Sequence, residues 1–289
     1  MVAPVPSGAT AGETVIASAR SGEPDRYLAA LLAPPSARPH LVALAAFASE
    51  LARVPALVTR EPAMAAIRLQ WWRDAVTAGA STRTGSPIAD AVLDAARQHG
   101  LPASLLIAVI DGREIEAARE PLDDEAALAD YLWKTEGALF VLAARVMGPE
   151  GSGEPAARAA RACGEAYGLA RLLIGLPRAL SQGWVPLPLS RVDASGTVPG
   201  RLLAGESDGA TQTLLAGMHA DAAQALVRSR PHVADLPRQL RPAFLPLALV
   251  EPYLRAFARP GRDALRNPTE VSPLTRVWRI AAAHWLGRL

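Results

Sequence analysis

The chain has 289 residues, of which 50% are hydrophobic, with one cysteine and a formal net charge of +2. Its length allows a sizeable core, and the single cysteine excludes internal disulfides and cysteine-based zinc clusters and fits a reducing compartment such as the cytoplasm. Arginines are scattered among acidic residues without forming a basic block, so nucleic-acid binding is not expected.

Residues 1–24 are predicted to form a flexible N-terminal leader ahead of one domain at residues 25–289. The leader has no charged segment followed by an apolar run, so it does not resemble a signal peptide. No uninterrupted apolar run approaches the roughly 18 residues needed to cross a bilayer, so no membrane span is expected.

Apolar residues recur at helical spacing along the rest of the chain, and no segment alternates as a strand does. The fold class is therefore predicted to be all-α. Asp123 and Asp124 are expected to begin a helix, and residues 183–210, rich in Pro, Gly and Ser, are expected to form a surface loop or a hinge. The expected helices are residues 25–32, 39–58, 61–79, 86–99, 102–118, 123–147, 153–182, 208–229, 236–257 and 272–287.

Two predicted helices carry side chains of interest. Trp71 and Trp72 are adjacent and point about 100° apart on a helix, so at least one indole is expected in the core. Asp111 and Glu114 lie at i, i+3 spacing, and composition favours a solvated face that also carries Arg113.

Motifs of the common metal-dependent and nucleophilic chemistries do not occur. The chain has no HExxH pair, no GxSxG elbow and no P-loop, so these motifs predict no metal, no cofactor and no catalytic residue. The histidines are widely separated in sequence: His40, His99, His219, His232 and His284.

Four segments resemble the squalene/phytoene synthases in order and spacing. They read DRYLAALLAPPSARPHLVALAAFASELARV, IRLQWWRDAV, YLWKTEGALFVLAARVMG and YGLARLLIGLPRALSQGWVPLP. The last ends on the family turn Gly-x-Val-x-Leu-Pro, which begins at Gly183. The resemblance runs from about Asp25 to the C-terminus and implies an isoprenoid-synthase-type helical bundle. In that family two aspartate-rich motifs on facing helices hold magnesium against a diphosphate.

Neither aspartate-rich motif is present at its expected place. Under the resemblance, the first motif falls on Ala52 and Ala56 with Arg53 at the adjacent acidic position, and the second falls on Gly175 and Ala179. These former motif positions are expected to line the pocket. Since metal-assisted departure of a diphosphate needs carboxylates to hold the metal, the ordinary reaction is not expected.

Arginine and glutamate side chains near these positions are candidates for a phosphate site or a metal-free ion pair. They are Glu50, Arg68, Arg171 and Arg178. The specific expectation is that Glu50 pairs with Arg53 or Arg171 across the former active site, because a direct ion pair would replace the metal bridges. Guanidinium groups also bind phosphate well without a metal.

Three stretches are similar to the catalytically degenerate branch of the family that includes a mitochondrial complex I assembly factor. They are FASELARV from Phe47, RLQWW from Arg68 and DGRE from Asp111. This resemblance implies a pseudoenzyme that assembles or stabilises a respiratory complex I subunit. The alternative is an active, magnesium-dependent head-to-head prenyl diphosphate transferase of isoprenoid biosynthesis. A third hypothesis is a carrier that holds an isoprenoid or another lipid in the old substrate tunnel.

The predicted C-terminal helix carries Trp278 and Trp285 together with Arg276, Arg279 and Arg288. An amphipathic helix of this composition either contacts an anionic membrane surface or packs against the bundle, and packing is the commoner role. From the single cysteine the chain is expected to be cytoplasmic. The C-terminal helix adds peripheral membrane contact as the alternative.

Overall fold

The computed structural model describes residues 10–58, 61–79 and 83–287, and within these ranges it contains helices and no strand. The all-α prediction is confirmed. The longer helices are α1 (Ala11–Gly22), α2 (Pro24–Leu31), α3 (Arg38–Arg53), α4 (Pro62–Ala78), α5 (Pro87–His99), α6 (Ala103–Ala118), α7 (Glu125–Leu132), α8 (Ala138–Met147), α9 (Glu154–Ser181), α12 (Gly209–Ala234), α13 (Val250–Phe257) and α14 (Pro273–Leu286). The shorter elements are η1 (Pro55–Leu57), η3 (Trp133–Gly137), η4 (Pro149–Ser152), α10 (Leu189–Ala194), α11 (Pro199–Leu203) and η5 (Arg238–Leu249).

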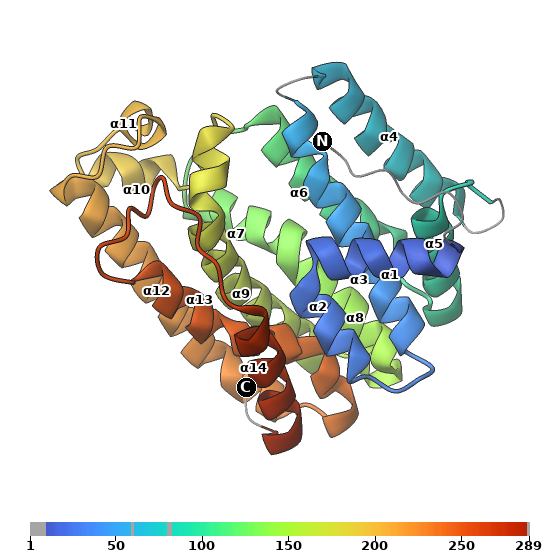
Figure 1. Ribbon diagram of the computed structural model, residues 1–289. Coiled ribbons are helices and arrows are strands. Elements are labelled where there is room, and N and C mark those ends of the chain that lie inside the picture. The colour runs from blue at the N-terminus through green and yellow to red at the C-terminus, as the bar shows by residue number, and fades with distance from the viewer. Residues whose placement is uncertain (1–9, 59–60, 80–82, 288–289) are drawn as a thin grey trace.

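Helix α9 is the centre of the bundle. Figure 1 shows α12 and α13 along one side of it and the helices α1, α2 and α3 on the other. Its Tyr167, Leu173 and Leu176 are fully buried, because the helix is enclosed on most of its circumference. The predicted helix at residues 153–182 is thus the principal core helix.

Helix α1 corrects the prediction of a flexible leader, which holds for none of the described residues 10–24. Thr10 and Glu13 form a capping box, in which the Thr10 hydroxyl accepts from the Glu13 N–H and the Glu13 carboxylate accepts from the Thr10 N–H. Val15 and Ala19 are buried. The helix packs closely on α3, since a Cβ at Gly22 would overlap Ser49. Residues 1–9 lie outside the described residues.

The helix predicted at residues 123–147 is interrupted by η3, a single π-helical turn between α7 and α8. Asp124 caps α7 by accepting a hydrogen bond from Ala127, as expected. Neighbouring helices approach the π-turn at glycines: a Cβ at Gly164 of α9 would lie 2.5 Å from the Cα of Gly137. An extra residue in the turn is therefore accommodated by small side chains opposite it.

Helix α3, continued through η1, is long enough and apolar enough in composition to cross a membrane. The stretch Arg38–Leu57 has a mean hydropathy of 1.3 over its most apolar window, although no uninterrupted apolar run was long enough. However, 67% of that window is buried inside the bundle, including Phe47 and Leu51. Core helices of globular proteins share this composition, and packing accounts for it here.

Two other sequence predictions concern the tryptophan pair of α4 and the segment at residues 183–210. Trp72 is buried and packs edge-on against Phe47, whereas Trp71 is partly exposed, so the expectation for the tryptophan pair is confirmed. The segment at residues 183–210 is less irregular than expected, because it contains the short helices α10 and α11.

Candidate functional site

A cavity of about 170 Å³ lies between α3, α6, the α7–η3 junction and α9. Its lining includes three of the five former motif positions, Ala52 on α3 and Gly175 and Ala179 on α9. Arg171 and Arg178 of α9 line the same cavity. At Gly175 a Cβ would meet no atom within 4 Å, so this wall faces open space.

The remaining predicted residues lie elsewhere. Ala56 is in η1 and Arg68 is exposed on α4, and neither lines the cavity. Arg53 and Glu50 do form an ion pair of 2.8 Å, but they are three residues apart on α3 and the Arg53 side chain is 52% exposed. The predicted Glu50–Arg53 pair therefore forms, but the expectation that it would cross the former active site is wrong, because both residues lie on α3.

Arg171 instead joins Glu23, which lies between α1 and α2. Arg171 Nη1 donates to Glu23 Oε2 at 2.7 Å, and Arg171 Nε lies 3.5 Å from Glu136 Oε1. Arg26 of α2 donates to the other oxygen of Glu136 at 2.6 Å. These four residues, called the buried quartet below, link α2, η3 and α9 with two acids and two guanidinium groups.

Solvent is almost absent from the quartet. Glu23 is 1% exposed, Arg26 and Glu136 are also buried, and Arg171 and Glu136 line the cavity. Burial alone would raise the pKa of Glu23, but the charges of Arg171 and Arg26 outweigh it and the pKa is lowered. Burial likewise opposes the charge of Arg171, yet Glu23 and Glu136 hold its pKa well above the usual value. Glu23 and Arg171 are therefore both charged at neutral pH.

A second set of charges completes the cavity wall. Arg113 of α6 donates to Glu116, whose Oε1 also accepts from Tyr131 Oη at 2.9 Å. Arg113 is buried, so the prediction that it would lie on a solvated face is wrong. The reason is that this face of α6 packs against η3, while Asp111 and Glu114 turn away and pair with an arginine of α4.

A third buried acid, Asp25 of α2, lies outside the cavity. It accepts hydrogen bonds from Tyr167 Oη at 2.8 Å and from Tyr253 Oη, and Arg276 Nε is 3.3 Å from its other oxygen. Burial raises the pKa of Asp25 in spite of these partners. Asp25 thus joins α2, α9, α13 and α14 at one point.

Magnesium, which the family resemblance implies, does not fit the residues present. Within the described ranges no group of three or more His, Cys, Asp or Glu side chains is placed to hold a metal ion. The two carboxylates on the cavity wall, Glu116 and Glu136, are each bound by guanidinium groups. Magnesium needs several free oxygen ligands in octahedral geometry, which these do not offer.

Sequence reasoning missed most of this arrangement. The partners of the quartet are up to 148 residues apart in the chain, so no local spacing reveals them. The available signal was the placement of charged residues within otherwise apolar helices. The structure also brings His40 Nδ1 and His99 Nε2 within 2.9 Å, although the two are distant in sequence.

Comparison with known proteins gives a consistent result. Residues 19–278 match the family model described as squalene/phytoene synthase. The chain is 28% identical over 250 residues to "NADH dehydrogenase (ubiquinone) complex I, assembly factor 6" of Mus musculus, covering 84% of this chain and 73% of that protein. The identity to the Rattus norvegicus protein of the same name is 28% over 266 residues, covering 89% and 78%.

Solved structures show the same fold at low identity. A dehydrosqualene synthase in complex with ligand superposes with a TM-score of 0.78 at 14% identity and covers 96% of both chains. Squalene synthase HpnC from Alicyclobacillus acidocaldarius gives a TM-score of 0.67 at 17% identity, covering 96% of this chain and 94% of the other. The isoprenoid-synthase-type bundle is therefore confirmed.

Proposed function

The chain belongs to the squalene/phytoene synthase family, and from that membership we propose that it is a non-catalytic member, an assembly or binding factor for NADH:quinone oxidoreductase. The observation that carries this proposal is the buried quartet. Beside the cavity that Ala52, Gly175 and Ala179 line, α2, η3 and α9 are joined by direct ion pairs of 2.6 and 2.7 Å. Such pairs hold the bundle closed without a metal.

The character of the cavity supports the same conclusion. Ala52, Gly175 and Ala179 supply no ligand atoms, and both wall carboxylates are already neutralised. Removing one charge-stabilising group from an active site commonly costs about 3 kcal/mol of transition-state stabilisation. Replacing two whole metal cradles would leave no ordinary route for diphosphate departure.

The assembly role is supported by the curated relatives. The mouse and rat proteins are named as complex I assembly factors and align with most of this chain. We extend that role to this chain, with a subunit of NADH:quinone oxidoreductase as its protein partner. No cofactor is needed for such binding.

One observation favours the alternative, an active prenyl diphosphate transferase. Three arginines, Arg113, Arg171 and Arg178, line the cavity and have the chemistry to bind a diphosphate. The cavity volume argues against both this alternative and a lipid carrier, because about 170 Å³ falls below the roughly 300 Å³ at which small-molecule sites usually begin.

Turnover of labelled prenyl diphosphates separates the two functions. Pure protein is incubated with farnesyl or geranylgeranyl diphosphate, with and without magnesium and NADPH, beside an active family member. We expect no product in the organic extract. A magnesium-dependent C30 or C40 hydrocarbon would overturn the non-catalytic assignment.

Genetic complementation tests the assembly role itself. Membranes from cells lacking the chain are expected to contain less assembled NADH:quinone oxidoreductase, measured on native gels and by NADH oxidation. Expression of the wild-type chain should restore the complex. Normal amounts of complex in its absence would contradict the assembly role while leaving the turnover result unaffected.

A further inference from the structure

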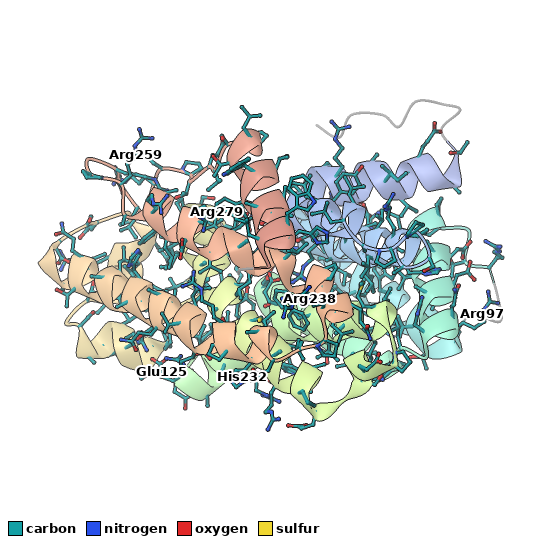
Figure 2. The ribbon with its side chains drawn as sticks, turned by 90° about the horizontal axis from the view of Figure 1, so that it is seen from below. Arg97, Glu125, His232, Arg238, Arg259 and Arg279 are labelled. Atoms are coloured by element: carbon teal, nitrogen blue, oxygen red, sulfur yellow. The ribbon has the colours of Figure 1, made fainter. Side chains whose placement is uncertain are left out.

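The C-terminal helix α14 has its charged side chains directed into the bundle. Arg279 Nη2 donates to Glu251 Oε2 at 2.8 Å, and Arg276 lies beside the buried Asp25. In Figure 2, Arg279 and Arg238 lie close to this helix, whereas Arg97 and Arg259 lie at the two ends of the molecule. These ion pairs determine which face of α14 points inward.

The outward face of α14 is apolar. Leu274, Trp278 and Trp285 are 82%, 70% and 74% exposed. Together with the partly exposed Ala281 they occupy positions i, i+4, i+7 and i+11, which form one stripe along a helix. The expected packing of this helix against the bundle is confirmed for its inward face, where Ile280 and Ala283 are buried, whereas the two tryptophans lie on the opposite, exposed face.

A contiguous exposed apolar surface of this kind normally marks an interaction site. Two tryptophans in line with a leucine are typical of segments that enter the boundary between lipid headgroups and acyl chains. An indole is favoured there because its ring is apolar while its N–H remains able to bond to water or headgroups.

A groove of about 900 Å³ begins beside Trp285, between α12, η5 and α14. Its polar lining is basic: Arg230, Arg238, Arg241 and His284, with no carboxylate among the described lining residues. Arg230 is neutralised by an acid of α13, and Arg241 donates to a backbone carbonyl.

Arg238 differs from the other two arginines because, within the described residues, it has no hydrogen bond or ion pair. It lies at the start of η5, next to the groove. A guanidinium group without a protein partner in a groove without acids is complementary to a phosphate.

We propose that α14 and this groove form a docking surface for a membrane whose lipids carry anionic phosphate headgroups. Leu274, Trp278 and Trp285 enter the interface, and Arg238 and Arg241 bind a headgroup phosphate in the groove. Charge complementarity selects this occupant over a second copy of the chain, since two copies would bring the same arginines together. The surface is separate from the cavity and does not depend on the proposed function.

Vesicle flotation tests the docking surface. Full-length protein is mixed with vesicles of phosphatidylcholine alone or of phosphatidylcholine with one quarter phosphatidylglycerol. We expect flotation with the anionic vesicles, weakened by high salt because surface attraction is screened. Equal binding to the neutral vesicles would show that the arginines do not recognise anionic headgroups, and it would overturn the proposal.

Three variants locate the contact. The double variant W278S/W285S is expected to weaken partition by about tenfold or more, through the loss of both interfacial side chains. R238Q is expected to weaken it about fivefold, the contribution of one arginine near an anionic surface. The control I67S removes a side chain that is 60% exposed on α4 and should float like the wild type.

Circular dichroism establishes that each variant is folded before it is compared. Unchanged flotation of W278S/W285S would overturn the proposal. So would a result in which the wild type does not bind vesicles but forms a dimer that W278S/W285S converts to monomer, because the surface would then join two copies.

Discussion

The buried quartet and helix α14 both depart from the usual distribution of polar and apolar groups, in opposite directions. The quartet places four charges inside the bundle, and each is paired within the protein. Helix α14 places tryptophans outside, and their exposed faces have no partner in the described chain. Buried charges with internal partners maintain the fold, whereas an exposed apolar stripe is available to something beyond the fold.

Arg171→Gln provides the strongest test of the structural role of the quartet. The substitution leaves the carboxyl groups of Glu23 and Glu136 buried, each with one guanidinium partner fewer. We expect the free energy of unfolding to fall by about 3–5 kcal/mol, measured by urea denaturation. A loss below about 1 kcal/mol would mean that the quartet is solvated and contributes little.

A double-mutant cycle strengthens that test. Because Glu23→Gln removes the charge that Arg171 neutralises, the double variant E23Q/R171Q should lose clearly less stability than the sum of the single variants. Additive losses would contradict a direct ion pair between these two residues.

Gly164→Ala examines how the π-turn is held beside the quartet. The new Cβ would lie 2.5 Å from the backbone of Gly137, so α9 and η3 must move apart. We expect a loss of about 1–3 kcal/mol in unfolding free energy. Gly175→Ala is the matched control on the same helix, where a Cβ meets nothing within 4 Å, and it should be neutral or stabilise by up to about 1 kcal/mol.

The pH dependence of stability distinguishes Glu23 from Asp25. The pKa of Glu23 is lowered from its ordinary 4.5, so its stabilising contribution is present above that pH and is lost as pH falls through the folded value. We expect the unfolding free energy of E23Q, measured by urea denaturation, to decline less steeply than that of the wild type as the pH falls below 4.5.

The pKa of Asp25 shifts in the opposite direction to that of Glu23. Its pKa is raised from 3.8, so the folded state binds its proton more tightly and the acid's contribution to stability decreases as pH rises through the folded value. We expect the unfolding free energy of D25N, measured by urea denaturation across pH 3–7, not to show this decrease with rising pH. An unchanged pH profile would show that Asp25 titrates like an exposed acid.

The double variant W278S/W285S should produce the smallest change in stability. Both indoles are exposed, and surface substitutions usually alter unfolding free energy by less than about 0.5 kcal/mol. The same variant is expected to abolish most vesicle binding. A loss of several kcal/mol would instead place the tryptophans in the packing of the fold.

Local patterns in the sequence predicted much of the fold. Helical periodicity predicted the all-α class and α9, and Asp124 was recognised as the start of a helix. Helix α1 was missed even though its capping box, Thr10-x-x-Glu13, is a readable signal, because the small and polar residues around it resemble a mobile leader.

The candidate site was predictable only in part. The family spacing gave Ala52, Gly175 and Ala179, which the structure brings to one cavity. The partner of Arg171 could not be read, since Glu23 meets it only through tertiary packing. For α14, amphipathic spacing defines two faces but does not say which one meets the bundle, and buried acids on other helices decide it.

The π-turn η3 has a consequence for how related sequences align with this one. A π-turn is one residue longer than the α-helical turn it replaces, so it shifts the phase of the helix by about 100°. A relative that lacks one residue between Trp133 and Gly137 would keep α8 in place but rotate α7, moving Tyr131 away from the cavity. A one-residue gap at this point of an alignment would therefore identify family members with a differently built cavity wall.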